Sequence, residues 1–150
     1  MNDIIMTLSG TRGIIGETFP PTIALQTGLA FGAMLQKGTV IVGTDTRTSH
    51  DMIKMAVISG LNAVGINTLD IGKVTTPTVQ QMILKYNAKG GIVVTASHNP
   101  IIWNGLKLMN QTGSFLEQEE FDSFMTWYNN DTHPLKGWDQ IGSNTAISTA

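Results

Sequence analysis

Two kinds of apolar pattern alternate along this chain and predict its elements. Short apolar runs predict buried strands at residues 4–8, 40–43 and 91–96, and residues 66–71 supply a further strand. Apolar residues spaced three and four apart predict helices between and after these runs, at residues 22–37, 53–64, 77–86 and 121–128. The alternation of strands and helices predicts an α/β fold with a largely parallel sheet.

Local signals mark where several of these helices begin. Thr48 or Ser49 can cap the second helix, and Thr76-Pro77 starts the third with proline at its first position. Ser114–Glu117 fits a capping box before the last helical stripe. Three glutamates cluster at this last helix start, where negative charge stabilises the helix N-terminus, and we assign them that role in preference to metal binding.

A short alternating stretch, Leu106–Met109, predicts one further strand, antiparallel and near the edge of the sheet. Lys107 would then point to the opposite face from Leu106 and Leu108. A lysine on an edge strand can simply prevent pairing with another chain, so a structural role for Lys107 stays open beside a chemical one.

Composition and charge narrow the function classes. The chain has 41% hydrophobic and 13% charged residues, a net charge of −2 and no cysteine. Disulfides and thiolate chemistry are excluded, and there is no basic surface of the kind that binds nucleic acid or an anionic membrane. We expect no signal peptide and no membrane-spanning segment, because no apolar stretch is long enough, and we expect a cytoplasmic protein.

The end of the chain carries no periodic pattern. From Asn129 onward, turn-forming and small polar residues dominate. We therefore predict one α/β domain at residues 1–130, followed at residues 131–150 by a linker toward a second, absent domain. The three histidines are scattered and have no metal-ligand spacing.

The strongest candidate for chemistry follows the predicted strand at residues 91–96. There the sequence Ser97-His98-Asn99-Pro100 favours a turn, which displays the serine hydroxyl on a constrained loop. A phosphoserine carries about −1.5 to −2 charges at neutral pH, and His98 and Lys107 are close enough in sequence to meet that charge. The alternative is that Ser97 only caps a turn and that His98 is an ordinary surface residue.

Two other loops follow strands and can share the same end of the sheet. Ser9–Gly13 combines glycines with Arg12, which suits phosphate binding, although such loops often mark only a turn. Thr44–Ser49 contains Asp45 and Arg47, which we expect to brace the loops. In parallel sheets the site lies beyond the carboxyl ends of the strands, so all three loops should converge there.

The stretch Gly91–Pro100, followed by Asn104-Gly105 and Lys107, resembles the active-site segment of the α-D-phosphohexomutases. This family comprises phosphoglucomutases, phosphomannomutases and phosphoglucosamine mutases. Arg12-Gly13 is similar to the family's N-terminal arginine loop, and the segment from 43 to 47 to its Gly-x-Asp-x-Arg motif. The resemblance covers residues 4–128 and implies the family's first domain, a three-layer fold with a mixed sheet between helices. Ser9, Thr11 and Thr44 depart from the commoner family residues.

The resemblance implies roles for individual residues. Ser97 would carry the phosphoryl group, donate it to a hexose phosphate, and recover it through a bisphosphate intermediate. Lys107 would be the general acid/base, while Arg12 and His98 would manage charge. Arg12, His98, Asn99 and Lys107 would bind substrate, and Ser97 would contact Mg²⁺ through its phosphate.

The rest of the family machinery is absent from these 150 residues. The acidic loop that supplies the other Mg²⁺ ligands, the sugar-reading loop and the phosphate-gripping loop belong to the family's other domains. We therefore expect the isolated domain to be inactive without them and to need Mg²⁺, a glucose 1,6-bisphosphate-type activator and the remaining mutase domains. The alternative is a non-catalytic binding or assembly module derived from that domain.

Overall fold

The computed structural model describes residues 4–148, which form one mixed sheet covered by helices on both faces. In spatial order its seven strands are β1-β2-β6-β5-β3-β4-β7. Their bounds are β1 Ile5–Thr7, β2 Gly10–Ile14, β3 Thr39–Thr44, β4 Asn67–Lys73, β5 Gly90–Val94, β6 Trp103–Asn110 and β7 Asn144–Ala146. Strands β5, β3, β4 and β7 are parallel, whereas β6, β2 and β1 pair antiparallel.

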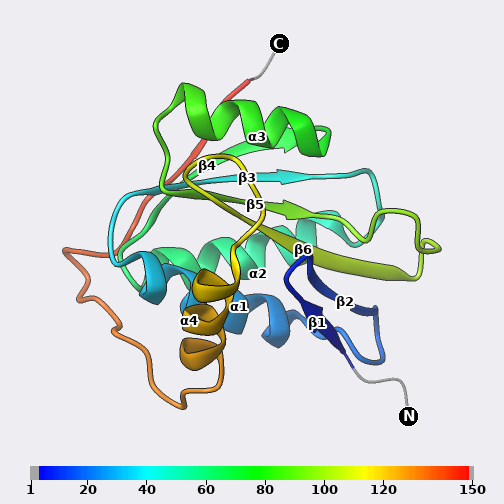
Figure 1. Ribbon diagram of the computed structural model, residues 1–150, viewed down its shortest axis with the longest axis horizontal. Coiled ribbons are helices and arrows are strands. Elements are labelled where there is room, and N and C mark those ends of the chain that lie inside the picture. Colours follow the sequence, from blue (N-terminus) through cyan, green and yellow to red (C-terminus); the bar gives the residue numbers. More distant parts are fainter. Residues whose placement is uncertain (1–3, 149–150) are drawn as a thin grey trace.

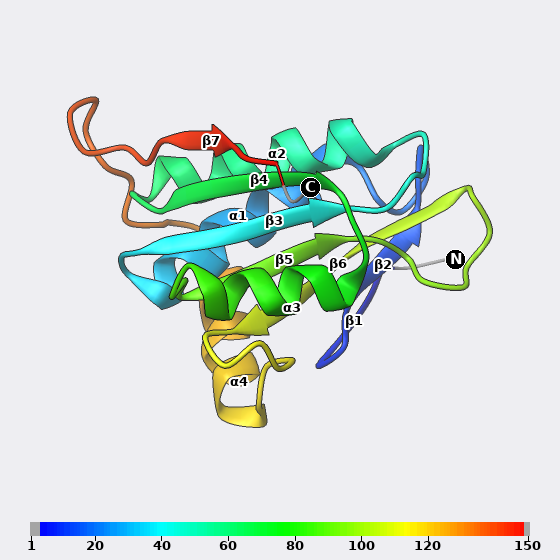
Figure 2. The same cartoon turned by 90° about the horizontal axis from the view of Figure 1, so that it is seen from above.

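Helices α1 (Pro21–Leu35) and α2 (His50–Ala63) cover one face of the sheet, and α3 (Thr76–Lys85) covers the other. The view from above shows the sheet between these layers (Figure 2). Helix α4 (Gln118–Tyr128) packs against α1. The three-layer α/β fold and its mixed sheet are therefore confirmed (Figure 1).

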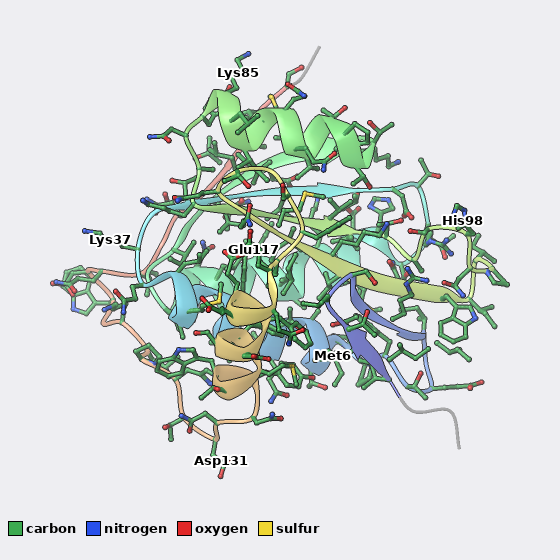
Figure 3. The ribbon with its side chains drawn as sticks, in the orientation of Figure 1. Met6, Lys37, Lys85, His98, Glu117 and Asp131 are labelled. Carbon is green, nitrogen blue, oxygen red and sulfur yellow. The ribbon has the colours of Figure 1, made fainter. Side chains whose placement is uncertain are left out.

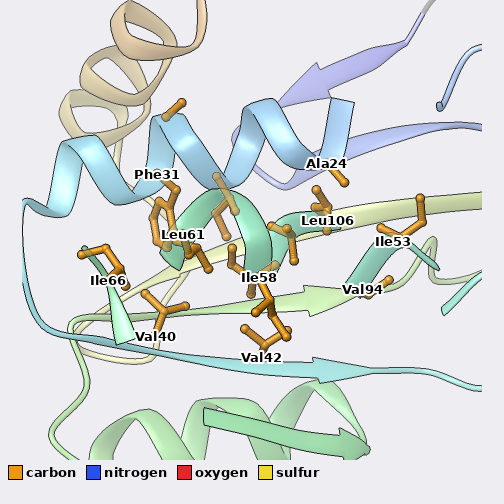
Figure 4. Close-up of a cluster of buried hydrophobic side chains, with 14 of the residues drawn as sticks. Ala24, Phe31, Val40, Val42, Ile53, Ile58, Leu61, Ile66, Val94 and Leu106 are labelled. Carbon is orange, nitrogen blue, oxygen red and sulfur yellow. The ribbon is translucent and has the colours of Figure 1, made fainter. Parts of the chain in front are cut away.

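The larger hydrophobic core lies between the sheet and the α1–α2 layer. Phe31 of α1 and Leu61 of α2 are fully buried against Val40 and Val42 of β3 (Figure 4). The two helices approach so closely that a Cβ atom on Gly60 would lie 2.8 Å from the Leu29 amide nitrogen. Only glycine fits at this crossing, so backbone contact sets the spacing of the layer.

A second, smaller core lies under α3. It contains buried residues from the sheet and from the helix, with Ile41 and Met109 fully buried on the sheet side. Alternate residues of each central strand thus face different cores, which is why β3 and β5 read as continuous apolar runs.

Two sequence predictions about strands were wrong. Arg12 lies in β2, paired opposite Gly105, and not in a loop. Strand β6 does not lie near the edge, because it has β5 on one side and β2 on the other. The glycine-rich sequence around Arg12 favours a loop locally, but the pairing of β2 with β6 and β1 overrides that preference.

The observed N-terminal caps of the helices differ in detail from those that the sequence predicts. The capping box of α4 is formed by Glu117 and Glu120, not by Ser114. Thr75, one residue before the predicted start, caps α3 by accepting from the Thr78 amide. Ser49 is the N-cap residue of α2, as one of the two alternatives, although its side chain makes no capping hydrogen bond.

Part of the segment expected to be a linker packs on the domain. Strand β7 pairs in parallel with β4 at the edge of the sheet, with Thr68 opposite Asn144. The Lys136 amide donates to the Ala63 carbonyl and the Gly142 amide to that of Asn62. Backbone pairing holds this exposed, polar strand, which explains the lack of an apolar pattern. Within residues 4–148, no helix has the length and apolarity needed to cross a membrane.

Candidate phosphoryl-transfer site

The turn after β5 presents Ser97 in a strained backbone conformation. Ser97 has φ 54°, in the left-handed region that side chains other than glycine rarely adopt. The Ser97 amide donates to the buried Thr95 hydroxyl at 3.0 Å, and the Asn99 amide donates to the Ala96 carbonyl at 3.1 Å. The Ser97 side chain is half-buried at the surface, not enclosed beneath other residues. Such local strain, held by its surroundings, is typical of functional turns.

The Arg47 guanidinium binds the backbone of this turn at several points. Arg47 donates to the carbonyl oxygens of Ser97 at 2.9 Å, Asn99 at 2.8 Å and Pro100 at 2.7 Å, and to that of Trp103 at 3.2 Å. Its Nε also donates to Asp45 at 3.0 Å, and its side chain is only 10% exposed. Because several carbonyls of one loop meet a rigid planar group, the loop can hold one conformation. The predicted bracing role of Asp45 and Arg47 is confirmed.

Arg12 reaches the same turn from β2. Its Nη1 donates to the Asn99 side-chain oxygen at 3.3 Å. Arg12 pairs opposite Gly105, where a Cβ atom would collide with the Thr11 carbonyl oxygen. The missing side chain at Gly105 lets β2 and β6 approach closely, and this brings Arg12 beside the turn.

Lys107 lies on β6 on the same face of the sheet as Arg12, because residues two apart on a strand share a face. Partial burial lowers the pKa of the Lys107 ammonium, and the nearby charge of Arg12 lowers it further. Two adjacent cations with a lowered lysine pKa suit the binding of an anion and the transfer of a proton.

The remaining residues of the motif have different surroundings. His98 is exposed at the tip of the turn, where Figure 3 shows it at the opposite end of the molecule from Lys37, and it makes no hydrogen bond with any described residue. Asn104 is fully buried and donates to the Ser49 hydroxyl at 2.8 Å, while accepting from the Gly105 amide. Asn104 therefore ties β6 to the start of α2 and acts structurally.

The described residues contain no group of three or more histidine, aspartate or glutamate side chains that could hold a metal. The carboxylate of Asp45, on a loop beside the turn, already accepts from Arg47. Since Mg²⁺ requires near-octahedral oxygen ligands, Ser97 could supply only one of them.

Comparison with known proteins decides the family. The family model described as phosphoglucomutase/phosphomannomutase, alpha/beta/alpha domain I, matches residues 4–133. The chain belongs to this family. Among curated relatives, the probable phosphoglucosamine mutase of Pyrococcus furiosus is 41% identical over 134 residues, which covers 89% of this chain and 30% of that protein. The phosphoglucomutase/phosphomannomutase of Thermococcus kodakarensis is 42% identical over 139 residues, with the same coverage.

Solved structures of the phosphohexomutase family show the same fold. A Thermus thermophilus protein, assigned as a candidate phosphomannomutase, superimposes with a TM-score of 0.84 at 28% identity, covering 99% of this chain and 34% of that chain. A phosphoglucomutase/phosphomannomutase family protein from Burkholderia thailandensis gives a TM-score of 0.74 at 25% identity, covering 96% and 33%. The chain thus spans about a third or less of the proteins it matches.

In the phosphohexomutase domain, Arg12 bonds to Asn99 in the turn that carries Ser97 and lies near enough to Lys107 to lower its pKa, whereas His98 is exposed and makes no hydrogen bond with any described residue. Sequence reasoning missed two contributors. Thr95 orients the Ser97 amide, and Phe115 lies 5.8 Å, measured to its ring centroid, from the Lys107 ammonium nitrogen. A threonine two residues before the serine is a usable signal for the first, because threonine hydroxyls often accept from nearby amides. No local signal links Phe115 to Lys107.

Proposed function

We propose that this chain is the phosphoserine-carrying domain of a sugar-phosphate mutase, with Ser97 as the carrier. The observation that supports it best is the strained, half-exposed turn at Ser97, clasped by Arg47 and flanked by Arg12. An ordinary capping turn has no need of one guanidinium bound to several of its carbonyls. A turn that must keep an anionic group at a fixed position does need such bonds.

The proposed transfer uses the groups of this corner in defined roles. The Ser97 oxygen bonds to phosphorus of a hexose bisphosphate while the bond from phosphorus to the sugar oxygen breaks. The serine proton leaves to a base, and the sugar oxygen takes up a proton to become a hydroxyl. Lys107 is our candidate for exchanging these protons, because burial and Arg12 lower its pKa and so make its proton easier to release. Arg12 balances the charge of the phosphoryl group.

The reverse transfer, to the other position of the hexose, would complete the exchange between the 1- and 6-positions. We propose that a hexose phosphate is the substrate and that a glucose 1,6-bisphosphate-type activator loads the serine. Mg²⁺ would supply charge neutralisation at the phosphoryl group, with its further ligands outside this chain. The sugar-binding groups would likewise lie in other domains, because the chain covers only 30% of its relatives.

Phosphate uptake by the purified chain tests the proposal. The chain is incubated with glucose 1,6-bisphosphate, with and without Mg²⁺ and with or without the other domains of a relative, and mapped by mass spectrometry. We expect one added phosphate on Ser97, absent from Ser97→Ala and most abundant when Mg²⁺ and the other domains are present.

The second candidate is a binding or assembly module that keeps the fold without the chemistry. The exposed His98 favours it, because that side chain makes no hydrogen bond or ion pair with any described group of the site. No phosphate on Ser97, even with the other domains and Mg²⁺ supplied, would support this module and overturn the catalytic proposal.

A further inference from the structure

The loop after β6 is built to place one aromatic ring. Asn110, at the end of β6, accepts through its side-chain oxygen from the amides of Thr112 and Ser114, at 3.0 and 3.3 Å, and donates to Glu120 at 3.0 Å. Gln80 of α3 holds the loop from the other side by donating to the Gly113 carbonyl at 2.9 Å. These bonds fix the backbone immediately before Phe115.

Phe115 lies on the face of the sheet that carries Lys107. It forms an antiparallel bridge with Met109, and bridged residues share a face, as do Met109 and Lys107 two positions apart on β6. The Lys107 ammonium nitrogen lies 5.8 Å from the centroid of the Phe115 ring, within the range of a cation–π contact. Phe115 as a whole residue remains 38% exposed, so core packing does not account for its position.

The charged groups near Lys107 do not attract its ammonium. Arg12 on β2 is the charged side chain that acts on the ammonium, and it repels it. The paired stretch of β5, Gly90–Val94, has no titratable residue, and α3 carries only Lys85, in its last turn. On the loop itself the titratable residue is Glu117, which forms the capping box of α4. Phe115 therefore provides the attractive partner of Lys107 that no carboxylate of residues 4–148 supplies.

We propose that Phe115 is a positioning residue for Lys107, its ring holding the ammonium in a cation–π contact against the repulsion of Arg12. The proposal rests on the proposed function only in giving this contact a catalytic purpose. An aromatic ring can hold the cation without neutralising it, whereas a carboxylate here would compete with the phosphoryl group for Arg12 and Lys107.

NMR of the Lys107 side chain, with labelled lysine in the intact 150-residue chain, tests the contact directly. Lys107→Arg identifies the Lys107 signals by their loss. We expect Phe115→Leu to lower the pKa of Lys107 by about 0.5 units and to abolish the ring-current shift of its ε-methylene protons. Phe115→Trp should keep both, because indole is the stronger cation–π partner.

A matched pair elsewhere in the chain provides the control. Lys85 lies 5.8 Å from the centroid of the Tyr86 ring, so Tyr86→Leu should remove the ring-current shift at Lys85 and leave Lys107 unchanged. The proposal is overturned if Phe115→Leu leaves the Lys107 signals unaltered. It is also overturned if Phe115→Leu and Phe115→Trp lower the pKa of Lys107 equally, since packing alone would then explain the effect. These signals need no substrate, so failure of phosphate uptake at Ser97 does not decide them.

Discussion

The α1–α2 layer and the Ser97 corner are held together by different forces. Between the helices, glycine backbones touch and fully buried apolar side chains fill the space against the sheet. At the corner, Arg47 donates to the carbonyls of a left-handed turn whose side chains reach the surface. Apolar packing supplies most of the folding free energy, whereas the polar clasp specifies one loop geometry.

This difference predicts which property a substitution in each region should change. Changes in the helix layer should reduce global stability and leave the chemistry of surviving molecules intact. Changes at the corner should alter local opening or phosphate uptake with little global effect, because loops open independently of the core. The experiments below test this division.

The largest effect is expected from Gly60→Ala in α2. Its Cβ would collide with the Leu25 carbonyl oxygen and lie 2.8 Å from the Leu29 amide nitrogen, so no side-chain rotation can relieve the clash. We expect a loss of about 3 kcal/mol in the free energy of unfolding by urea denaturation. Gly137→Ala is the control, because its nearest contact is the movable Asp139 carboxylate at 3.3 Å, and it should be nearly neutral. Equal losses would mean that helix contact is not the cause.

Arg47→Met should act locally at the turn. Hydrogen bonds to a charged group contribute about 1.5–3 kcal/mol, so we expect hydrogen exchange at the Asn99 and Trp103 amides to rise about 30-fold, or about 2 kcal/mol. Exchange in β3 should change much less. Arg12→Met removes only the single 3.3 Å bond to Asn99 and should leave both amides nearly unchanged. A uniform rise across the sheet would show that Arg47 supports the core.

Ser97→Gly should separate backbone strain from chemistry. Glycine relieves the left-handed conformation, worth about 1 kcal/mol, but gains entropy in the unfolded chain, so the net change should stay within about 0.5 kcal/mol. Phosphate uptake should be abolished. Ser97→Val should instead destabilise the fold measurably in thermal melts, because a β-branched residue resists positive φ. Equal stability of the two variants would argue that the turn relaxes freely.

The smallest effect concerns pH. Because burial and Arg12 lower the pKa of Lys107 in the folded state, the unfolded chain binds more protons between that pKa and 10.5. The free energy of unfolding therefore rises with pH across that window because of this group. Lys107→Met should flatten this pH dependence, as measured by denaturation.

Lys54 should change stability with pH in the direction opposite to that of Lys107. Burial alone would lower its pKa, but the hydrogen bond and charge of Asp70, with a contribution from Asp51, raise it. The stability that Lys54 contributes is fully present below pH 10.5, its unfolded-state pKa, and is lost as pH rises through its folded-state pKa. Lys54→Met should therefore remove this fall in stability at high pH. The same slope change in both variants would contradict the assigned causes.

Much of the fold follows from local pattern because the signals lie within single elements. The apolar runs that became β3 and β5 and the periodic stripes of α1 and α2 report burial on known faces. The Ser97 turn was equally visible, since Asn99-Pro100 ends a strand by its own geometry. The meeting of the loops after β3 and β5 followed from one topological rule about parallel sheets, whereas Arg12 reaches the turn from strand β2 and not from the predicted third loop.

The errors share a cause. β2 looked like a loop and β6 like an edge strand because partners distant in the sequence determine both. β7 carries no pattern, because its backbone pairs with β4 without burying apolar side chains. Phe115 gave no sign of its place over Lys107, since a loop bound to Asn110 and Gln80 positions it.

The sequence by itself determined the apolar elements, the serine turn and the residue types that can manage phosphate charge. These properties depend on side-chain chemistry and on backbone preferences within a few residues. Only the tertiary structure decided which cations meet at that turn, which strand each occupies and which ring faces the lysine. Those contacts join residues far apart in the chain, and the pairing of whole strands fixes them.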